Sequence, residues 1–172
     1  LKMQDHSNSI LNWTNKQMMK INESKTKYLV FNFTDLYQFN TRLYINDILL
    51  ECEDTTTLLG VEIQNNLKWE SNTSFLIKKA YSRMTLITKL IKFGIPIKDL
   101  ILIYVLYIRS VLEYCCIVWH TSLTQDQTND LERVQKVAIR TILGDHDIPY
   151  ETALKKVKVQ SLFERREFLS LR

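Results

Sequence analysis

The chain has 172 residues, of which 45% are hydrophobic and 24% charged, a size and composition that suit one domain or a small module joined to a helical domain. Its net charge of +4 is uneven: residues 1–77 carry 7 basic and 9 acidic side chains, whereas residues 78–172 carry 16 and 10. The basic second half is compatible with a phosphate-backbone partner, and the alternative is an ordinary solvated helical surface. Cys52, Cys115 and Cys116 form no Cys-x-x-Cys pair, which argues against a secreted disulfide framework and against a zinc site.

No segment of the sequence predicts secretion or a membrane partner. The N-terminus is polar and mixed, and the uninterrupted part of the most apolar region, residues 100–108, is too short to span a bilayer. We therefore expect an intracellular protein. Because the first residue is Leu1 and the last, Arg172, falls within a helical pattern, we also expect a fragment of a longer chain.

The first seventy residues predict one helix and several strands. In chain order these are a helix over 8–20, a polar turn over 22–26, a strand over 27–33, a hairpin over 42–51 and a strand over 57–63. Asn46 and Asp47 form the predicted hairpin turn, since both residue types tolerate positive φ. Gly60 interrupts the last strand and indicates a bulge or the close approach of another backbone.

The rest of the chain predicts helices, over 71–92, 98–119, 124–143 and 150–172, the last with a break near 160–161. Gly94 and Gly144 stop two of them, and Thr124 with Gln127 matches a capping box. The segment 98–119 is apolar nearly all round, so we expect it to be buried on most sides. The predicted fold class is α+β: a small antiparallel sheet with one covering helix in residues 1–70, followed by a mostly helical region in 71–172.

Two motifs in the first half occur in a specific order. Residues 22–26 read Asn-Glu-Ser-Lys-Thr, and residues 58–61 read Leu-Leu-Gly-Val. Together they resemble the back half of the palm of reverse transcriptases from non-LTR retrotransposons of the jockey and RTE type. The helical region is similar to the part of those enzymes that includes the thumb, at residues 79–80, 109–114, 118–119 and 131–136. The resemblance covers nearly the whole chain and depends on the ordered set, since no single piece is specific.

The resemblance implies roles for four residues. Lys25 would lie near the phosphates of the incoming nucleotide and act as a general acid for the leaving pyrophosphate, the alternative being a solvated turn lysine. Leu59 and Gly60 would belong to the primer grip, where a glycine lets the backbone approach nucleic acid. Trp69 would stack on a base or sugar, the alternative being packing between sheet and helix.

The resemblance also implies what the chain does. The expected function is that of a fragment of an RNA-directed DNA polymerase, contributing primer grip and template–primer binding. Its partners would be an RNA template with its DNA primer duplex and the rest of the polymerase chain, in the cytoplasm and nucleus. The full-length parent would use Mg²⁺, whereas this fragment would bind no cofactor and, having no Asp-Asp pair, would be inactive alone.

A rival interpretation is a non-catalytic helical module that binds nucleic acid or protein, from a decayed or domesticated element. A relic without function is a third. In the family pattern more typical Asp and His residues stand where this chain has Asn66 and Asn72, a departure that concerns the geometry after the primer grip.

Basic residues on the predicted helix 124–143 indicate a nucleic-acid contact without reference to the family. Arg133, Lys136 and Arg140 follow each other at i, i+3 and i+7, so they share a face that could reach phosphates. The alternative is an ordinary exposed face. No metal site is predicted, since residues 145–147, Asp-His-Asp, lack a fourth ligand at a sensible spacing.

Overall fold

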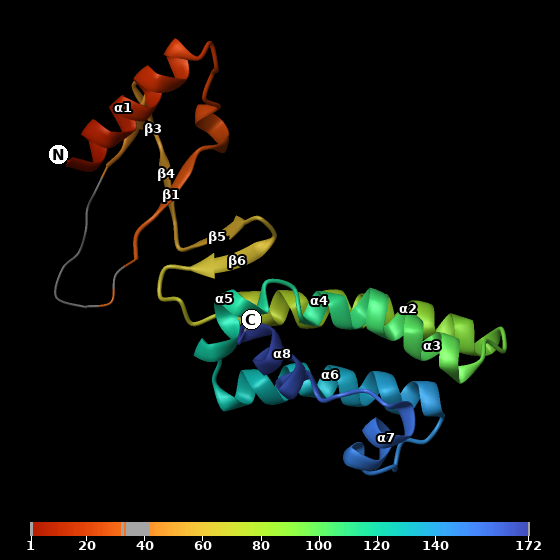
Figure 1. Cartoon of the computed structure of the whole chain (residues 1–172). Coiled ribbons are helices and arrows are strands. Elements are labelled where there is room, and N and C mark those ends of the chain that lie inside the picture. The colour runs from red at the N-terminus through yellow and green to blue at the C-terminus, as the bar shows by residue number, and fades with distance from the viewer. Residues whose placement is uncertain (1, 32, 34–41, 172) are drawn as a thin grey trace. The chain divides into compact units, whose positions relative to one another are not determined.

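In the computed structural model of the chain, residues 2–31, 33 and 42–171 are described. They form a mixed α+β structure, as the sequence predicts at that coarse level. The chain divides into two compact units, Leu1–Leu67 (the N-terminal unit) and Lys68–Arg172 (the helical unit). The boundary predicted from the sequence lies after residue 70. Figure 1 labels the α-helices and most of the strands of both units.

The N-terminal unit contains short elements. Its described residues form α1 (Lys2–Lys16), η1 (Glu23–Lys25), β1 (Lys27–Leu29), β2 (Tyr44–Ile45), β3 (Ile48–Leu49), β4 (Glu51–Glu53), β5 (Thr55–Leu58) and β6 (Val61–Gln64). The strands pair two by two, β1 with β4 in parallel and β2 with β3 and β5 with β6 antiparallel. The single antiparallel sheet predicted here is therefore wrong. Tight turns close two of the pairs locally, and strands this short leave little edge for a further strand.

The β2–β3 hairpin confirms the predicted turn. Asn46 and Asp47 have φ values of 49° and 61°, so both central residues are left-handed, as a type I′ turn requires. Asn and Asp adopt this region at low cost because their short polar side chains can hydrogen-bond locally.

The β5–β6 hairpin corrects the prediction of one strand over 57–63. Leu59 and Gly60 have φ values of 50° and 81° and join two antiparallel strands in which Leu58 pairs with Val61. Gly60 is thus a turn residue and not a bulge. The sequence misleads because leucine, an unfavourable residue for φ > 0, occupies the first turn position.

Helix α1 begins and ends earlier than the predicted span 8–20. The chain leaves the helix after Lys16, and Met18 adopts a φ of 55°. The Gln4 side chain ties the helix to β2, donating to the carbonyl of Tyr44 (2.8 Å) and accepting from its N–H (2.9 Å). The predicted strand 27–33 is also shorter, since β1 ends at Leu29; residue 32 lies outside the described residues.

A small apolar core holds this unit together. Leu43, Ile45 and Leu50 are buried, and the partly buried side chains packed against them are Leu11, Ile21 and Tyr28. The core therefore joins the β2–β3 hairpin to α1 and β1.

The helical unit consists of helices of very different length. Its described residues form α2 (Glu70–Lys92), α3 (Ile97–Ile103), a π-helical segment η2 (Tyr104–Arg109), α4 (Ser110–Leu112), α5 (Cys116–Trp119), η3 (His120–Ser122), α6 (Gln125–Leu143), α7 (Tyr150–Val157) and α8 (Leu162–Ser170). Helix α2 packs against α6, and α8 packs against α5 and α6 (Figure 1). The core is drawn from all the long helices; its largest fully buried apolar side chains include Leu76, Ile87, Leu100, Trp119, Leu131, Ile139 and Leu162.

The helix signals predicted at Thr124, Gln127 and Gly144 are confirmed. Thr124 and Gln127 form a capping box at the start of α6, and Gly144 ends that helix with a φ of 66°. A second capping box, Ser161 with Glu164, begins α8 after the predicted break. These local signals work because each cap satisfies backbone groups that the helix itself leaves without partners.

The predicted helix over 98–119 is corrected in two ways. It widens into η2 and then breaks, with Cys115 left-handed at a φ of 51°. It is also not buried on most sides, because Leu102, Leu106 and Ile117 are each more than half exposed. An apolar helix is buried all round only where neighbouring elements cover every face, and in this unit they leave one side of the segment exposed.

Among the described residues, no single helix is long and apolar enough to cross a membrane. The bent pair Ile97–Leu112 and Cys116–Ser122 meets that test together, by length and composition alone.

Candidate nucleic-acid interface

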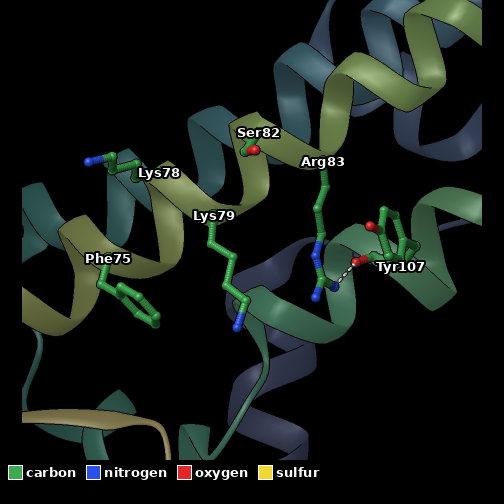
Figure 2. Close-up of a pocket in the computed structure, with 6 residues that line it drawn as sticks. All are labelled: Phe75, Lys78, Lys79, Ser82, Arg83 and Tyr107. Atoms are coloured by element: carbon green, nitrogen blue, oxygen red, sulfur yellow. Dashed lines mark hydrogen bonds between the residues drawn. The ribbon is translucent and has the colours of Figure 1, made fainter. Parts of the chain in front are cut away.

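A basic groove lies along α2, beside η2. Its lining residues are Phe75, Lys78, Lys79, Ser82, Arg83 and Tyr107, and its volume is about 450 Å³. Phe75, Lys79 and Arg83 follow each other at i, i+4 and i+8, so they form one stripe along the helix. Figure 2 shows these three side chains leaving α2 on the same side, with the Lys78 amine pointing away from them.

Tyr107 reaches the groove from η2. Arg83 donates a hydrogen bond from Nη1 to the Tyr107 carbonyl, and its guanidinium carbon lies 4.3 Å from the centroid of the Tyr107 ring (Figure 2). The Lys79 ammonium similarly lies 5.4 Å from the centroid of the Phe75 ring. Each ring thus carries a cation on its face, a favourable arrangement that holds the charges beside an apolar surface.

The chemistry of this groove suits a phosphate-bearing chain. Lys78 and Lys79 are exposed and can neutralise phosphates, while Arg83 is half-buried and partly occupied by Tyr107. Phe75 and Tyr107 remain partly exposed and offer faces or edges to a base or sugar. Of the lining residues, only Lys79 belongs to the family pattern seen in the sequence. The i, i+4, i+8 spacing of the stripe on α2 can be read from the sequence. Tyr107 comes to lie beside the stripe only because η2 packs on α2.

The three predicted basic residues of α6 differ in availability. Arg133 is exposed and pairs with Asp130 at 3.1 Å, and Lys136 is half-buried. Arg140 donates to the carbonyl of Ile148 from Nε (3.1 Å) and Nη2 (2.7 Å). Arg140 therefore holds the loop that follows α6, and its predicted use as a phosphate contact competes with that structural role.

The primer-grip candidates of the N-terminal unit lie at the tip of a hairpin. Leu59 is 83% exposed, and Gly60 beside it is exposed as well. Lys25 is exposed at the end of η1, where its N–H donates to the Asn22 side chain at 3.1 Å. These positions are accessible, and they belong to a different unit from the basic groove.

Trp69 is a correction to the predicted contacts. It is 5% exposed and precedes α2 with a φ of 59°. A ring this deeply buried has no free face for a base or sugar.

A buried polar network, absent from the sequence analysis, connects α6 to its neighbours. Gln135 is fully buried; it accepts from the Tyr104 hydroxyl (2.6 Å) and donates to the Tyr150 hydroxyl (2.9 Å) and the Gln160 carbonyl (2.9 Å). Burial raises the pKa of Tyr104 well above its ordinary value, and burial and then the hydrogen bond to Glu132 raise that of Tyr150. Both phenols are therefore hydrogen-bond donors at any physiological pH, and the network is structural.

Glu132 joins this network to the start of α8. Its carboxylate accepts a hydrogen bond from the Tyr150 hydroxyl. It also accepts one from the N–H group of Leu162 and one from that of Phe163, both at 3.0 Å. Those two N–H groups are in the first turn of α8 and have no partner within the helix. The negative charge of Glu132 also complements the positive end of the α8 dipole.

Arg166 is a fully buried cation beside this network. Its Nε donates to His120 Nδ1 at 3.4 Å, and its guanidinium carbon lies 5.8 Å from the centroid of the Trp119 ring. Neither of its Nη atoms has a hydrogen-bond partner among the described residues. Burial and then the nearby Arg166 charge lower the pKa of His120.

No cluster of three or more His, Cys, Asp or Glu side chains in the described part of the chain could hold a metal ion. Comparison with protein-family models, with curated proteins and with solved structures gives no match for this chain.

Proposed function

We propose that the helical unit binds the phosphate backbone of a template–primer duplex through the basic groove. The observation that carries this proposal is the combination of Lys79 and Arg83 with the partly exposed rings of Phe75 and Tyr107 in one groove, which the exposed Lys78 also lines. Lysines supply affinity without regard to sequence, and aromatic side chains supply contacts that every nucleotide can make.

The finer proposal is that the chain is a fragment of an RNA-directed DNA polymerase of a non-LTR retrotransposon. It is supported by the resemblance of residues 22–26 and 58–61 to the palm and by the basic helical region that follows them. In this proposal the exposed tip at Leu59 and Gly60 contributes to the primer grip. Lys25 lies near the phosphates of the incoming nucleotide, and the catalytic aspartates and their Mg²⁺ belong to the parent enzyme.

A second candidate is a non-catalytic nucleic-acid-binding or protein-interaction module. The observation that favours it is the helical unit itself, which has its own core and its own groove. The two candidates differ in primer extension: a module fails to extend a primer even when the rest of a polymerase chain is supplied in trans, whereas a polymerase fragment restores extension in that mixture.

The test is binding of the purified chain to a fluorescein-labelled RNA–DNA hybrid, followed by anisotropy across a salt series. Replacing Lys78 and Lys79 with alanine should weaken binding about tenfold at low salt and reduce the salt slope by about two, because two phosphate contacts are lost. The matched control is Lys89→Ala with Lys92→Ala, on the same helix but outside the groove.

The dissociation constant of the hybrid for the control double variant should stay within about twofold of the wild-type value, since these two lysines do not line the groove. Equal losses of affinity in the two double variants would indicate that only overall charge matters, and would contradict binding through the basic groove. No binding at low salt would contradict nucleic-acid binding by this chain.

A further inference from the structure

A second groove, lined by none of the residues of the basic groove, lies along α3 and the end of α7. It consists of two adjoining cavities of about 330 Å³ and 360 Å³ that share four lining residues, Lys98, Ile101, Val157 and Lys158. Leu102 and Val105 extend the apolar floor of the second cavity. We call the two cavities together the lysine-rimmed groove.

The floor of this groove is apolar and open. Ile101, Val105 and Val157 are half-buried, and Leu102 is 55% exposed although it lies on a helix of the main core. Covering such side chains is favourable in proportion to the apolar area removed from water. An apolar floor of this kind is the usual feature of sites that receive side chains of a partner.

The rim carries positive charge from two separate elements. Lys98 belongs to α3, Lys156 to the last turn of α7, and Lys158 follows α7 directly. Within residues 2–31, 33 and 42–171, none of the three ammonium groups forms an ion pair. The one acidic residue of the lining, Asp99, leaves the rim with an excess of positive charge.

Lys158 occupies a backbone position that glycine would fill more easily. It ends α7 in the left-handed conformation, with φ 57° and ψ 44°. Helices commonly end on a glycine in this conformation, because a Cβ is unfavourable there. A lysine at this position adds an ammonium group to the rim at a cost in backbone conformation.

We infer that the lysine-rimmed groove binds an acidic amphipathic peptide, with apolar side chains on the floor and carboxylates at the rim. Charge complementarity selects this occupant: the lysines come from two separate elements and line both cavities, so they match carboxylates spaced along a chain and not one compact headgroup. Two adjoining cavities suit two apolar side chains from one face of an amphipathic helix that lies in the groove.

The experiment is selection of random peptides of about twelve residues, displayed on phage, against the purified full chain, with Leu102→Glu as the counter-selection bait. Leu102 is more than half exposed, so the variant can fold, yet the new carboxylate lies on the floor of the groove. We expect the recovered peptides to carry Leu, Ile or Phe at i and i+3 or i+4, flanked by Asp or Glu.

Charge reversal then tests the rim. Replacing Lys98 and Lys156 with glutamate should weaken binding of a recovered, fluorescein-labelled peptide at least about tenfold, and a peptide with its acidic residues changed to lysine should regain affinity for that double variant. The control Lys89→Glu, an exposed lysine of α2 outside both cavities, should change the dissociation constant by less than about twofold.

Five results would overturn the inference. The recovered peptides could lack acidic residues, or bind the rim variant unchanged. Vesicles of phosphatidylcholine and phosphatidylserine could bind in a way that the Lys98→Glu, Lys156→Glu variant abolishes, while no peptide is recovered. Leu102→Glu could abolish a concentration-dependent self-association seen by sedimentation, which would make the occupant a second copy. An RNA–DNA hybrid could displace the peptide, which would assign the groove to the nucleic-acid surface.

Discussion

Glu132 shows how much a single side chain of the helical unit holds in place. Its carboxylate joins α6 to the Tyr150 hydroxyl and to two N–H groups at the start of α8. Hydrogen bonds to a charged acceptor are among the stronger ones in proteins, and removing the acceptor leaves partly buried donors without partners. The residue is therefore more important for stability than its place on a charged helix suggests.

Glu132→Ala should lower the free energy of unfolding by about 2–4 kcal/mol, because three donors lose a charged acceptor. Urea unfolding followed by tryptophan fluorescence would measure it. The control Asp130→Ala removes the partner of exposed Arg133 on the same helix and should cost less than about 1 kcal/mol. Equal effects of the two variants would contradict the structural role of Glu132.

His120 makes stability depend on pH. Burial and then the Arg166 charge lower its pKa in the folded state, so below about pH 6.5, the ordinary histidine value, the unfolded chain binds more protons than the folded one. The contribution of neutral His120 to the free energy of unfolding should be fully present above that pH. It should be lost as the pH drops towards the lowered pKa of the folded state.

The urea midpoint of the wild-type chain should accordingly decrease between pH 7.5 and pH 5.5, a window above the range in which most carboxylates titrate. His120→Gln should flatten this slope, whatever its effect on stability at pH 7.5. His146→Gln, in the exposed loop after α6, is the control and should keep the slope of the wild-type chain. An unchanged slope in His120→Gln would assign the pH dependence to other groups.

At the scale of elements, turn residues decide the pairing of the short strands. The β2–β3 turn has Asn46 and Asp47 in left-handed conformations that suit them, whereas the β5–β6 turn has Leu59 in the same region. A left-handed conformation costs an ordinary residue about 1–2 kcal/mol. The second hairpin is thus the strained one, at the tip proposed as the primer grip.

Leu59→Asn should slow amide exchange in Thr55–Leu58 and Val61–Gln64 and stabilise the hairpin by about 0.5–1 kcal/mol, since asparagine tolerates this φ. The control Leu58→Asn changes a strand residue of the same type, one position earlier, and should not slow exchange. If Leu59 contacts the primer, Leu59→Asn should also weaken binding of the hybrid despite the more stable turn. Faster exchange in Leu59→Asn would contradict a strained turn.

At the scale of the whole molecule, the two units have cores of unequal size. The N-terminal unit buries Leu43, Ile45 and Leu50 with a few neighbours, while the helical unit buries large side chains from all its long helices. The fraction of surface that a chain buries rises with its size, so small units with small cores are marginal.

The segment Lys68–Arg172, purified alone, should therefore unfold cooperatively and keep the near-ultraviolet circular dichroism of its buried Trp69 and Trp119. Leu1–Leu67 alone should be less stable, and its amides should exchange faster. Loss of the tryptophan signal in the isolated helical unit, with helix content retained, would show that its packing depends on the rest of the chain.

The sequence alone determined the features that depend on near neighbours in the chain. The helices 71–92 and 124–143, the stop at Gly144, the Thr124 capping box and the Asn46-Asp47 turn were all predicted, because a cap or turn needs only residues a few positions apart. The exposed face at Arg133 could also be located in this way, from its spacing on the helix.

Only the tertiary structure decided how distant residues are used. It paired β1 with β4 in parallel, left one side of the segment 98–119 open, and buried Trp69. It also engaged Arg140 with Ile148 and brought Tyr107 to the basic groove. Periodicity shows which residues share a face but not whether that face meets solvent, a neighbouring helix or a backbone carbonyl, because burial depends on which surfaces the packed elements leave uncovered.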